Sequence, residues 1–282
     1  MRFEFVMGME TMIERAWTAV AEHRVIRTRL CLLLVVAVVA CSQPPADLSE
    51  AVEAGDTFGA RAFLEGGADP DRPVVNGLTP LMRAANRDDP EMTSLLLEWG
   101  ADITAGSAGL TAVHIAAGAN ASDALEVLLS AGADPAVRSA GGMNALDYAA
   151  ELGAADVVEA LVAAGLEPDG PSLVVTQGHG YPRDEGPTPL AIAVRGGHVD
   201  VVRALLALGA DVDARSAAGH TPLLVAVFSD QTPEMVEILL AGGADPSATA
   251  RCDLGCSVEG LLTVAEWAVE LDRVELSELL RG

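Results

Sequence analysis

The sequence predicts an all-α repeat solenoid, in which helix pairs stack on one another and turns project from one edge. Segments that begin with a helix N-capping residue recur about every 33 residues. Each of these starts is followed by an apolar stretch that ends in glycine, as a second helix would. One such unit cannot bury its own apolar face, so it must stack on its neighbours.

The first helix of each unit is predicted to begin at a threonine or an asparagine. The side-chain oxygen of these residues caps a helix, and proline fits the first helical position. Alanine pairs further along the helix let neighbouring helices approach closely. The five starts are Thr79-Pro80-Leu81, Thr111-Ala112-Val113-His114, Asn144-Ala145-Leu146, Thr188-Pro189-Leu190 and Thr221-Pro222-Leu223.

The second helix of each unit is rich in leucine and valine and is predicted to end at a glycine. Glycine takes the left-handed conformation that commonly caps a helix, and the Asp-rich residues after it suit a turn. The six endings are Gly67-Ala68-Asp69, Gly100-Ala101-Asp102, Gly132-Ala133-Asp134, Gly165-Leu166, Gly209-Ala210-Asp211 and Gly243-Ala244-Asp245.

These starts and endings resemble the ankyrin repeat over about residues 46–282. The resemblance implies a stack of helix pairs with projecting β-turns or hairpins, and about seven repeats with divergent terminal ones. It also implies protein binding through the turn tips and the exposed side of the first helix. The positions that match these contact sites include Asn86, Arg87, Arg195, His220 and Phe228. Arg83 and Tyr148 replace the family's usual aliphatic residue and are further candidate contact residues.

The histidines have separate expectations within this resemblance. His114 occupies the family's Thr-Pro-Leu-His position and His198 its Gly-His position, so both are expected to be structural. His220 lies near a turn tip and is expected to be exposed.

Nearly all of the negative charge belongs to the repeat region. Residues 1–40 hold five of the 17 basic residues and four of the 41 acidic ones, which leaves 12 and 37, a net charge of −25, without any lysine. Such a surface repels phosphates and anionic lipid headgroups, so we exclude a nucleic-acid partner. It suits a basic protein partner, or it serves solubility alone.

A short apolar run near the N-terminus is predicted to direct export. Arg24, Arg27 and Arg29 precede an uncharged stretch, residues 30–40, which ends at Cys41. Its eleven residues are too few to span a bilayer as a helix, but they fit the apolar region of a secretory signal peptide.

The residues Val38-Val39-Ala40-Cys41 resemble the lipobox of bacterial lipoproteins. The resemblance implies cleavage between Ala40 and Cys41, followed by acylation of Cys41 with enough chains for stable anchoring. It divides the chain into a signal peptide (1–40), a lipidated tether (41–45) and a repeat domain (46–282). An ordinary signal peptide and an uncleaved anchor remain alternatives, and the true start codon is left open.

Ser42, directly after the cysteine, resembles the residue found in lipoproteins that are sent to the outer membrane. We therefore expect anchoring to the outer membrane, facing the periplasm. The periplasmic face of the inner membrane and the cell surface are the alternatives.

Two insertions interrupt the repeat spacing, near residues 171–185 and 252–261. Insertions in such stacks map to one edge, often the binding edge. The first insertion is a functional loop or a neutral one, and its distinctive side chains are His179, Tyr181 and Arg183. The second contains Cys252 and Cys256, for which a disulfide, two free thiols and a metal site all stay open.

No nucleophile elbow, zinc-protease helix, phosphate-binding loop or complete dinucleotide fingerprint occurs in the sequence. The Asp69/Asp71 and Asp211/Asp213 pairs fall in repeat turns and are expected to be structural. We therefore expect no catalysis, cofactor or metal.

The preferred hypothesis is a monomeric, membrane-tethered interaction module, which acts as a scaffold or as an immunity-like inhibitor of an envelope protein. The alternative is an enzyme or metal-dependent protein whose site lies in the 171–185 loop. A purely structural envelope protein is a third possibility.

Overall fold

The computed structural model describes residues 45–73, 77–107, 109–170, 172, 186–216, 219–251 and 261–281. Contacts divide the chain into one unit of residues 1–46 and another of residues 47–282. The second unit holds all of the described helices and strands. No described helix is both long enough and apolar enough to cross a membrane.

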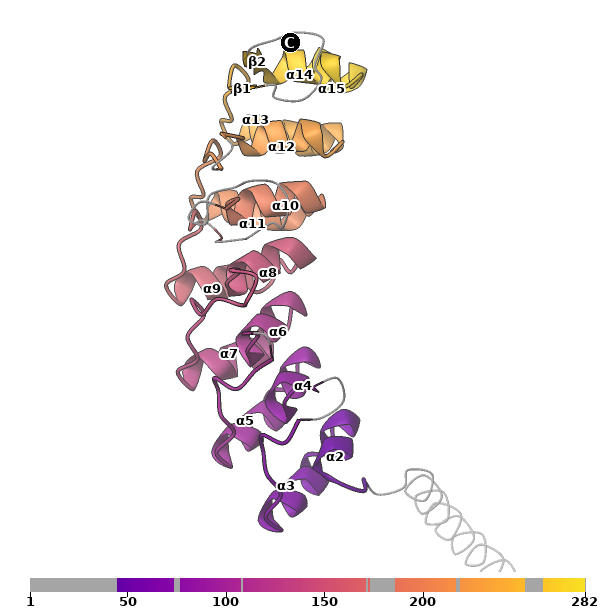
Figure 1. The fold of residues 1–282 in the computed structure, drawn as a ribbon, viewed down its shortest axis with the longest axis vertical. Coiled ribbons are helices and arrows are strands. Elements are labelled where there is room, and N and C mark those ends of the chain that lie inside the picture. The colour runs from indigo at the N-terminus through magenta and orange to yellow at the C-terminus, as the bar shows by residue number, and fades with distance from the viewer. Residues whose placement is uncertain are drawn as a thin grey trace, which may run out of the picture. The chain divides into compact units, whose positions relative to one another are not determined.

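The described helices form seven consecutive antiparallel pairs (Figure 1). In chain order the pairs are α2 (Leu48–Ala54) with α3 (Thr57–Glu65), α4 (Pro80–Asn86) with α5 (Pro90–Glu98), α6 (Ala112–Gly118) with α7 (Ser122–Ser130), α8 (Ala145–Leu152) with α9 (Val158–Ala163), α10 (Pro189–Gly196) with α11 (Val199–Ala207), α12 (Pro222–Phe228) with α13 (Pro233–Ala241), and α14 (Val264–Glu270) with α15 (Val274–Leu279).

The pairs stack so that like helices lie beside like helices. Each of the first helices α4, α6, α8, α10 and α12 packs against the first helix of the repeat before it and of the repeat after it. Second helices also meet, as α5 does with α3 and α7, and α11 with α9. This arrangement confirms the all-α repeat solenoid that the sequence predicts.

The capping residues begin the helices as predicted. The Thr79 hydroxyl oxygen accepts the Met82 N–H at 3.2 Å, and the Asn144 side chain accepts the Asp147 N–H at 3.0 Å. The six glycines at the predicted endings all have φ between 84° and 102°, a left-handed conformation that strains other residues. Helix boundaries are therefore set by local hydrogen bonds and backbone preferences.

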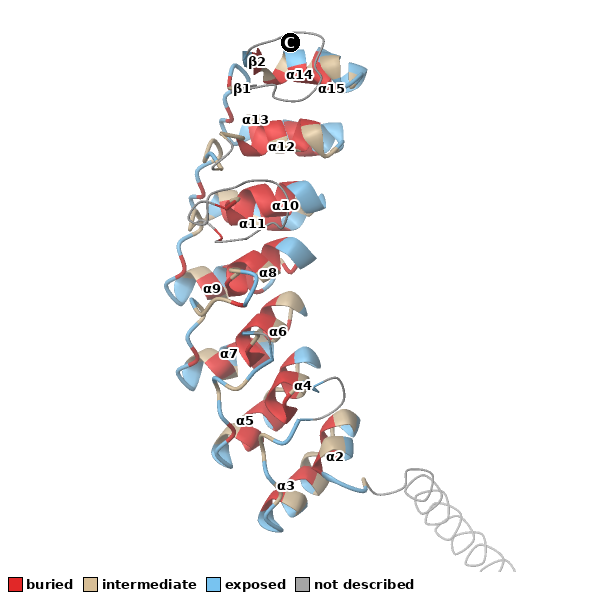
Figure 2. Ribbon diagram, viewed as in Figure 1, coloured by how far each residue is buried: buried red, intermediate tan, exposed pale blue. Residues whose placement is uncertain are grey.

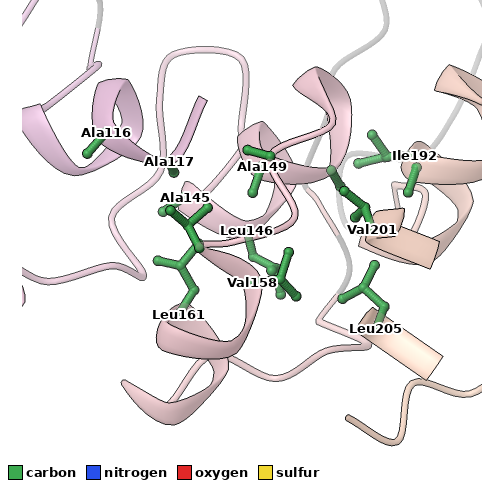
Figure 3. Packing of buried hydrophobic residues seen from close by; sticks show 14 of the residues in the cluster. Ala116, Ala117, Ala145, Leu146, Ala149, Val158, Leu161, Ile192, Val201 and Leu205 are labelled. Atoms are coloured by element: carbon green, nitrogen blue, oxygen red, sulfur yellow. The ribbon is translucent and has the colours of Figure 1, made fainter. Parts of the chain in front are cut away.

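The core runs through the stack from pair to pair (Figure 2). Small side chains allow the first helices to approach, and Ala116, Ala117 and Ala149 are completely buried there. Branched side chains such as Leu161 and Leu205 fill the space beneath them, again without exposure (Figure 3). Each repeat thus depends on its neighbours for burial.

The described residues on either side of both insertions are paired. Strand β1 (Thr249–Arg251) pairs antiparallel with β2 (Leu261–Thr263), so Arg251 lies opposite Leu261. At the first insertion, the backbone N–H of Ser172 donates to the Pro187 carbonyl at 3.2 Å. The described residues that flank each insertion are therefore hydrogen-bonded to each other.

Candidate protein-binding surface

The predicted contact residues of the first helices share one face of the stack. Asn86 and Arg87 end α4, Arg195 lies in the last turn of α10, and Phe228 ends α12. Because the first helices lie side by side, these ends form a row. Asn86, Arg87 and Arg195 are exposed, whereas Phe228 is half-buried.

Two of the predicted arginines bind glutamates of the preceding repeat. Arg83 pairs with Glu53 of α2, and both side chains are largely covered. The Arg195 Nη2 lies 2.7 Å from the Glu151 Oε2, and both side chains are about half exposed. Each pair links neighbouring repeats, and an exposed pair of this kind contributes at most about 1 kcal/mol to stability.

His114 is structural, as the sequence predicts. Its ring is buried, and its Nδ1 accepts the Thr111 backbone N–H at 3.1 Å. The Nε2 must then hold the proton, which it donates to the Val137 carbonyl of the next repeat at 3.0 Å. Burial lowers the pKa of His114 and favours this neutral form.

Tyr148 is held in place by its surroundings. Its hydroxyl donates to the Ser139 Oγ at 3.3 Å, and its ring meets the His114 ring edge-on with centroids 5.4 Å apart. The side chain is half-buried, so only part of it is available to a partner.

The expectation that His220 is exposed is wrong. Its ring packs edge-on against Phe228, with centroids 5.0 Å apart, and Phe228 packs in turn against Trp267 at 4.9 Å. This half-buried environment lowers the pKa of His220. Trp267 lies on α14 in the next repeat, so spacing within one repeat could not show that its ring joins this cluster.

A buried carboxyl was not anticipated. Asp147 stands at the position that His114 holds in the preceding repeat, and it is completely buried. Its Oδ2 accepts the Asn144 N–H at 2.9 Å, but its Oδ1 has no hydrogen-bond partner. Burial raises the pKa of Asp147 to about 7, against the Asn144 hydrogen bond and the charge of Arg138, which lower it. The aspartate in place of the motif histidine was the available sequence signal.

An apolar pocket of about 210 Å³ lies between α8 and α10. It is lined by Met143, Tyr148, Glu151, Leu152, Pro187, Ile192 and Arg195. Leu152 is 59% exposed. A Cβ atom on Gly118 would come within 2.7 Å of the Leu152 Cδ1, so the glycine leaves room for this side chain.

The aspartate pairs in the turns are structural, as predicted. The Asp71 Oδ1 accepts the backbone N–H of Asp102 in the next turn at 2.9 Å, and the Asp213 Oδ1 accepts that of Asp245 at 3.0 Å. These bonds connect successive repeats. Among the described residues, no group of three or more His, Cys, Asp and Glu side chains is placed to bind a metal ion.

Several predicted residues lie outside the described part of the chain. They are Ala40 and Cys41 at the expected cleavage site, His179, Tyr181 and Arg183 in the first insertion, and Cys252 and Cys256 in the second.

The repeats define a class. A family model of ankyrin repeats matches residues 48–139, 108–172 and 170–250, so the chain belongs to the ankyrin repeat family. Ankyrin repeats are protein–protein interaction modules.

Many solved structures, 544 chains, resemble this fold. One is the ankyrin repeat domain of Bcl-3, described as a unique member of the IkappaB protein family. It is 26% identical in sequence, with a TM-score of 0.65, and the match covers 86% of this chain and 99% of that domain. No curated protein sequence matches.

Proposed function

We propose that this chain is an exported lipoprotein whose ankyrin repeats hold or inhibit another protein of the bacterial envelope, without catalysis. The observation that supports binding most directly is the exposed face formed by the first helices. Asn86, Arg87, Leu152 and Arg195 are exposed there on α4, α8 and α10. Such repeats bind proteins through a surface assembled from several units.

The position of Cys41 supports anchoring close to a membrane. It follows the apolar run of residues 30–40, and Asp47, where the repeat unit begins, is only six positions further along the chain. Six residues extend at most about 22 Å. An acylated Cys41 would therefore hold the first repeat near the bilayer, facing the periplasm if the outer membrane is the destination.

The anchor is tested by replacing Cys41 with Ser. Cells that express the full chain are fed a clickable fatty acid, and the chain is then isolated and assayed for label and for membrane association. We expect Cys41→Ser to abolish both, because the thioether cannot form. The matched control is Cys31→Ser, which changes a cysteine inside the expected signal peptide and should keep both. Label that persists in Cys41→Ser would contradict the proposed anchor.

Binding is tested by photo-crosslinking in cells. A photoreactive amino acid at Asn86 is expected to give a discrete adduct with an envelope protein. The control places the same group at Glu126, which is exposed on the second helix α7. If neither position gives an adduct, or both give the same non-specific pattern, the interaction role is overturned. Pull-down of the adduct partner in low and high salt then shows whether opposite charge drives the association.

A further inference from the structure

Acidic residues lie in the turns and, among the helices, mainly on the second helices. Those of the middle repeats hold eight acidic residues and one basic residue: Glu91, Glu98, Asp123, Glu126, Glu159, Asp200, Glu234 and Glu237, with Arg203. The first helices of the same repeats hold only Arg83, Asp147, Glu151 and Arg195. Of these, Asp147 is buried.

The pocket between α8 and α10 lies on this weakly charged face. Its only charged groups, Glu151 and Arg195, bind each other at 2.7 Å, so their charges largely cancel. A charged side chain that entered would lose hydration without gaining an unpaired counter-ion. An apolar side chain meets no such penalty.

The walls of the pocket are already in place. Ile192 is 1% exposed and cannot move without disturbing the core, and Tyr148 is fixed by Ser139 and His114. Leu152 extends over Gly118, whose missing side chain makes the room. Little ordering is therefore needed on binding, which favours affinity.

Two other hollows differ in their chemistry. One, between α3 and α5, is lined by Arg61, Glu91 and Glu98 among others. The second, beside the start of α15, has Asp230, Asp272 and Arg273 in its walls. Both are rich in charged groups, so they are less suited to an apolar anchor.

We propose that the pocket between α8 and α10 receives one Leu, Met or Phe side chain from an uncharged segment of a protein partner. A cavity of about 150 Å³ is enough for a benzene ring, so about 210 Å³ accommodates one such side chain. The inference rests on the proposed binding function and specifies its partner. The acidic second helices then act on the rate of encounter with a basic protein and not on recognition at the pocket.

The test uses a random peptide library selected on the full chain. We expect the enriched peptides to share Leu, Met or Phe at one position. Leu152→Arg should weaken their binding about ten-fold or more, because it places a charge in the apolar wall. Raising the salt from about 50 to 500 mM should change the affinity less than about three-fold.

Val274→Arg is the matched control. Val274 is 59% exposed, the same fraction as Leu152, but it lies on α15, away from the pocket. This variant should bind the selected peptides as the wild type does, and Leu152→Met should restore binding. An unchanged urea midpoint for Leu152→Arg shows that the fold is intact.

Four results would overturn the proposal. The first is selection of peptides rich in Arg and Lys whose binding is lost in high salt. The second is peptide binding that Leu152→Arg leaves unchanged. A third is peptide binding that is seen only after residues 173–185 are deleted, which would show that this segment of the chain itself occupies the pocket. The fourth is a dimer that Leu152→Arg abolishes, which would show that a second copy of the chain occupies it. If one of these results is found but cross-linking from Asn86 still captures a partner, the pocket proposal fails and the proposed binding function stands.

Discussion

Replacing Asp147 with asparagine should stabilise the protein strongly at pH 8 and by less than half as much at pH 5. The carboxyl has a pKa of about 7 when folded and an ordinary value of 3.8. The folded state therefore keeps a proton that the unfolded chain releases, and stability falls as pH rises from about 4 to about 7. Above about pH 7 the free energy of unfolding shows no further loss from this group.

The size of the effect follows from the two pKa values. A difference of about three units corresponds to about 4 kcal/mol, at roughly 1.4 kcal/mol per unit. Asparagine has the shape of the acid and stays neutral. Its carbonyl can accept the Asn144 N–H, and its NH₂ group replaces the unpaired Oδ1. It thus resembles the protonated acid, so a gain of roughly 3–5 kcal/mol is expected at pH 8.

Urea unfolding between pH 5 and pH 8.5 measures this effect. Glu159→Gln, which neutralises an exposed carboxylate on α9, is the control and should stay within about 0.5 kcal/mol of wild type throughout. The reasoning is refuted if wild-type stability is flat across this range. It is refuted equally if Asp147→Asn destabilises the protein as much at pH 8 as at pH 5.

Two further predictions concern the stack itself. Leu161→Ala should lower the free energy of unfolding by about 2–5 kcal/mol, because Leu161 is fully buried. Leu152→Ala should lower it much less, because Leu152 is exposed. Equal losses for the two variants in urea unfolding would contradict the burial pattern. Gly132→Ala should cost about 1–2 kcal/mol, because its φ of 90° strains any residue with a Cβ atom, and a neutral thermal midpoint would show that this helix end relaxes.

The sequence predicted the helices well because the groups that start and end them act locally. Thr79 bonds a backbone N–H three residues away, and Gly132 needs only its own φ angle. The role of His114 was also predictable, since Thr111 lies within the same motif.

The binding face was harder to predict because its properties depend on neighbouring repeats. Arg83 and Arg195 were recognised as candidate contact residues, but their glutamate partners lie 30 and 44 residues earlier. His220 was expected to be exposed, yet its ring packs edge-on against Phe228, which packs in turn against Trp267 of the next repeat. Such contacts depend on the register between repeats.

The sequence by itself determined the repeat, its helix ends and the excess of acidic residues, because these follow from composition and from interactions within a few residues. Only the tertiary structure showed that Asp147 is buried with an unpaired oxygen. It alone placed Leu152 and Ile192 around one pocket. The physical reason is that burial and pocket shape arise where two repeats meet, and neither repeat has them alone.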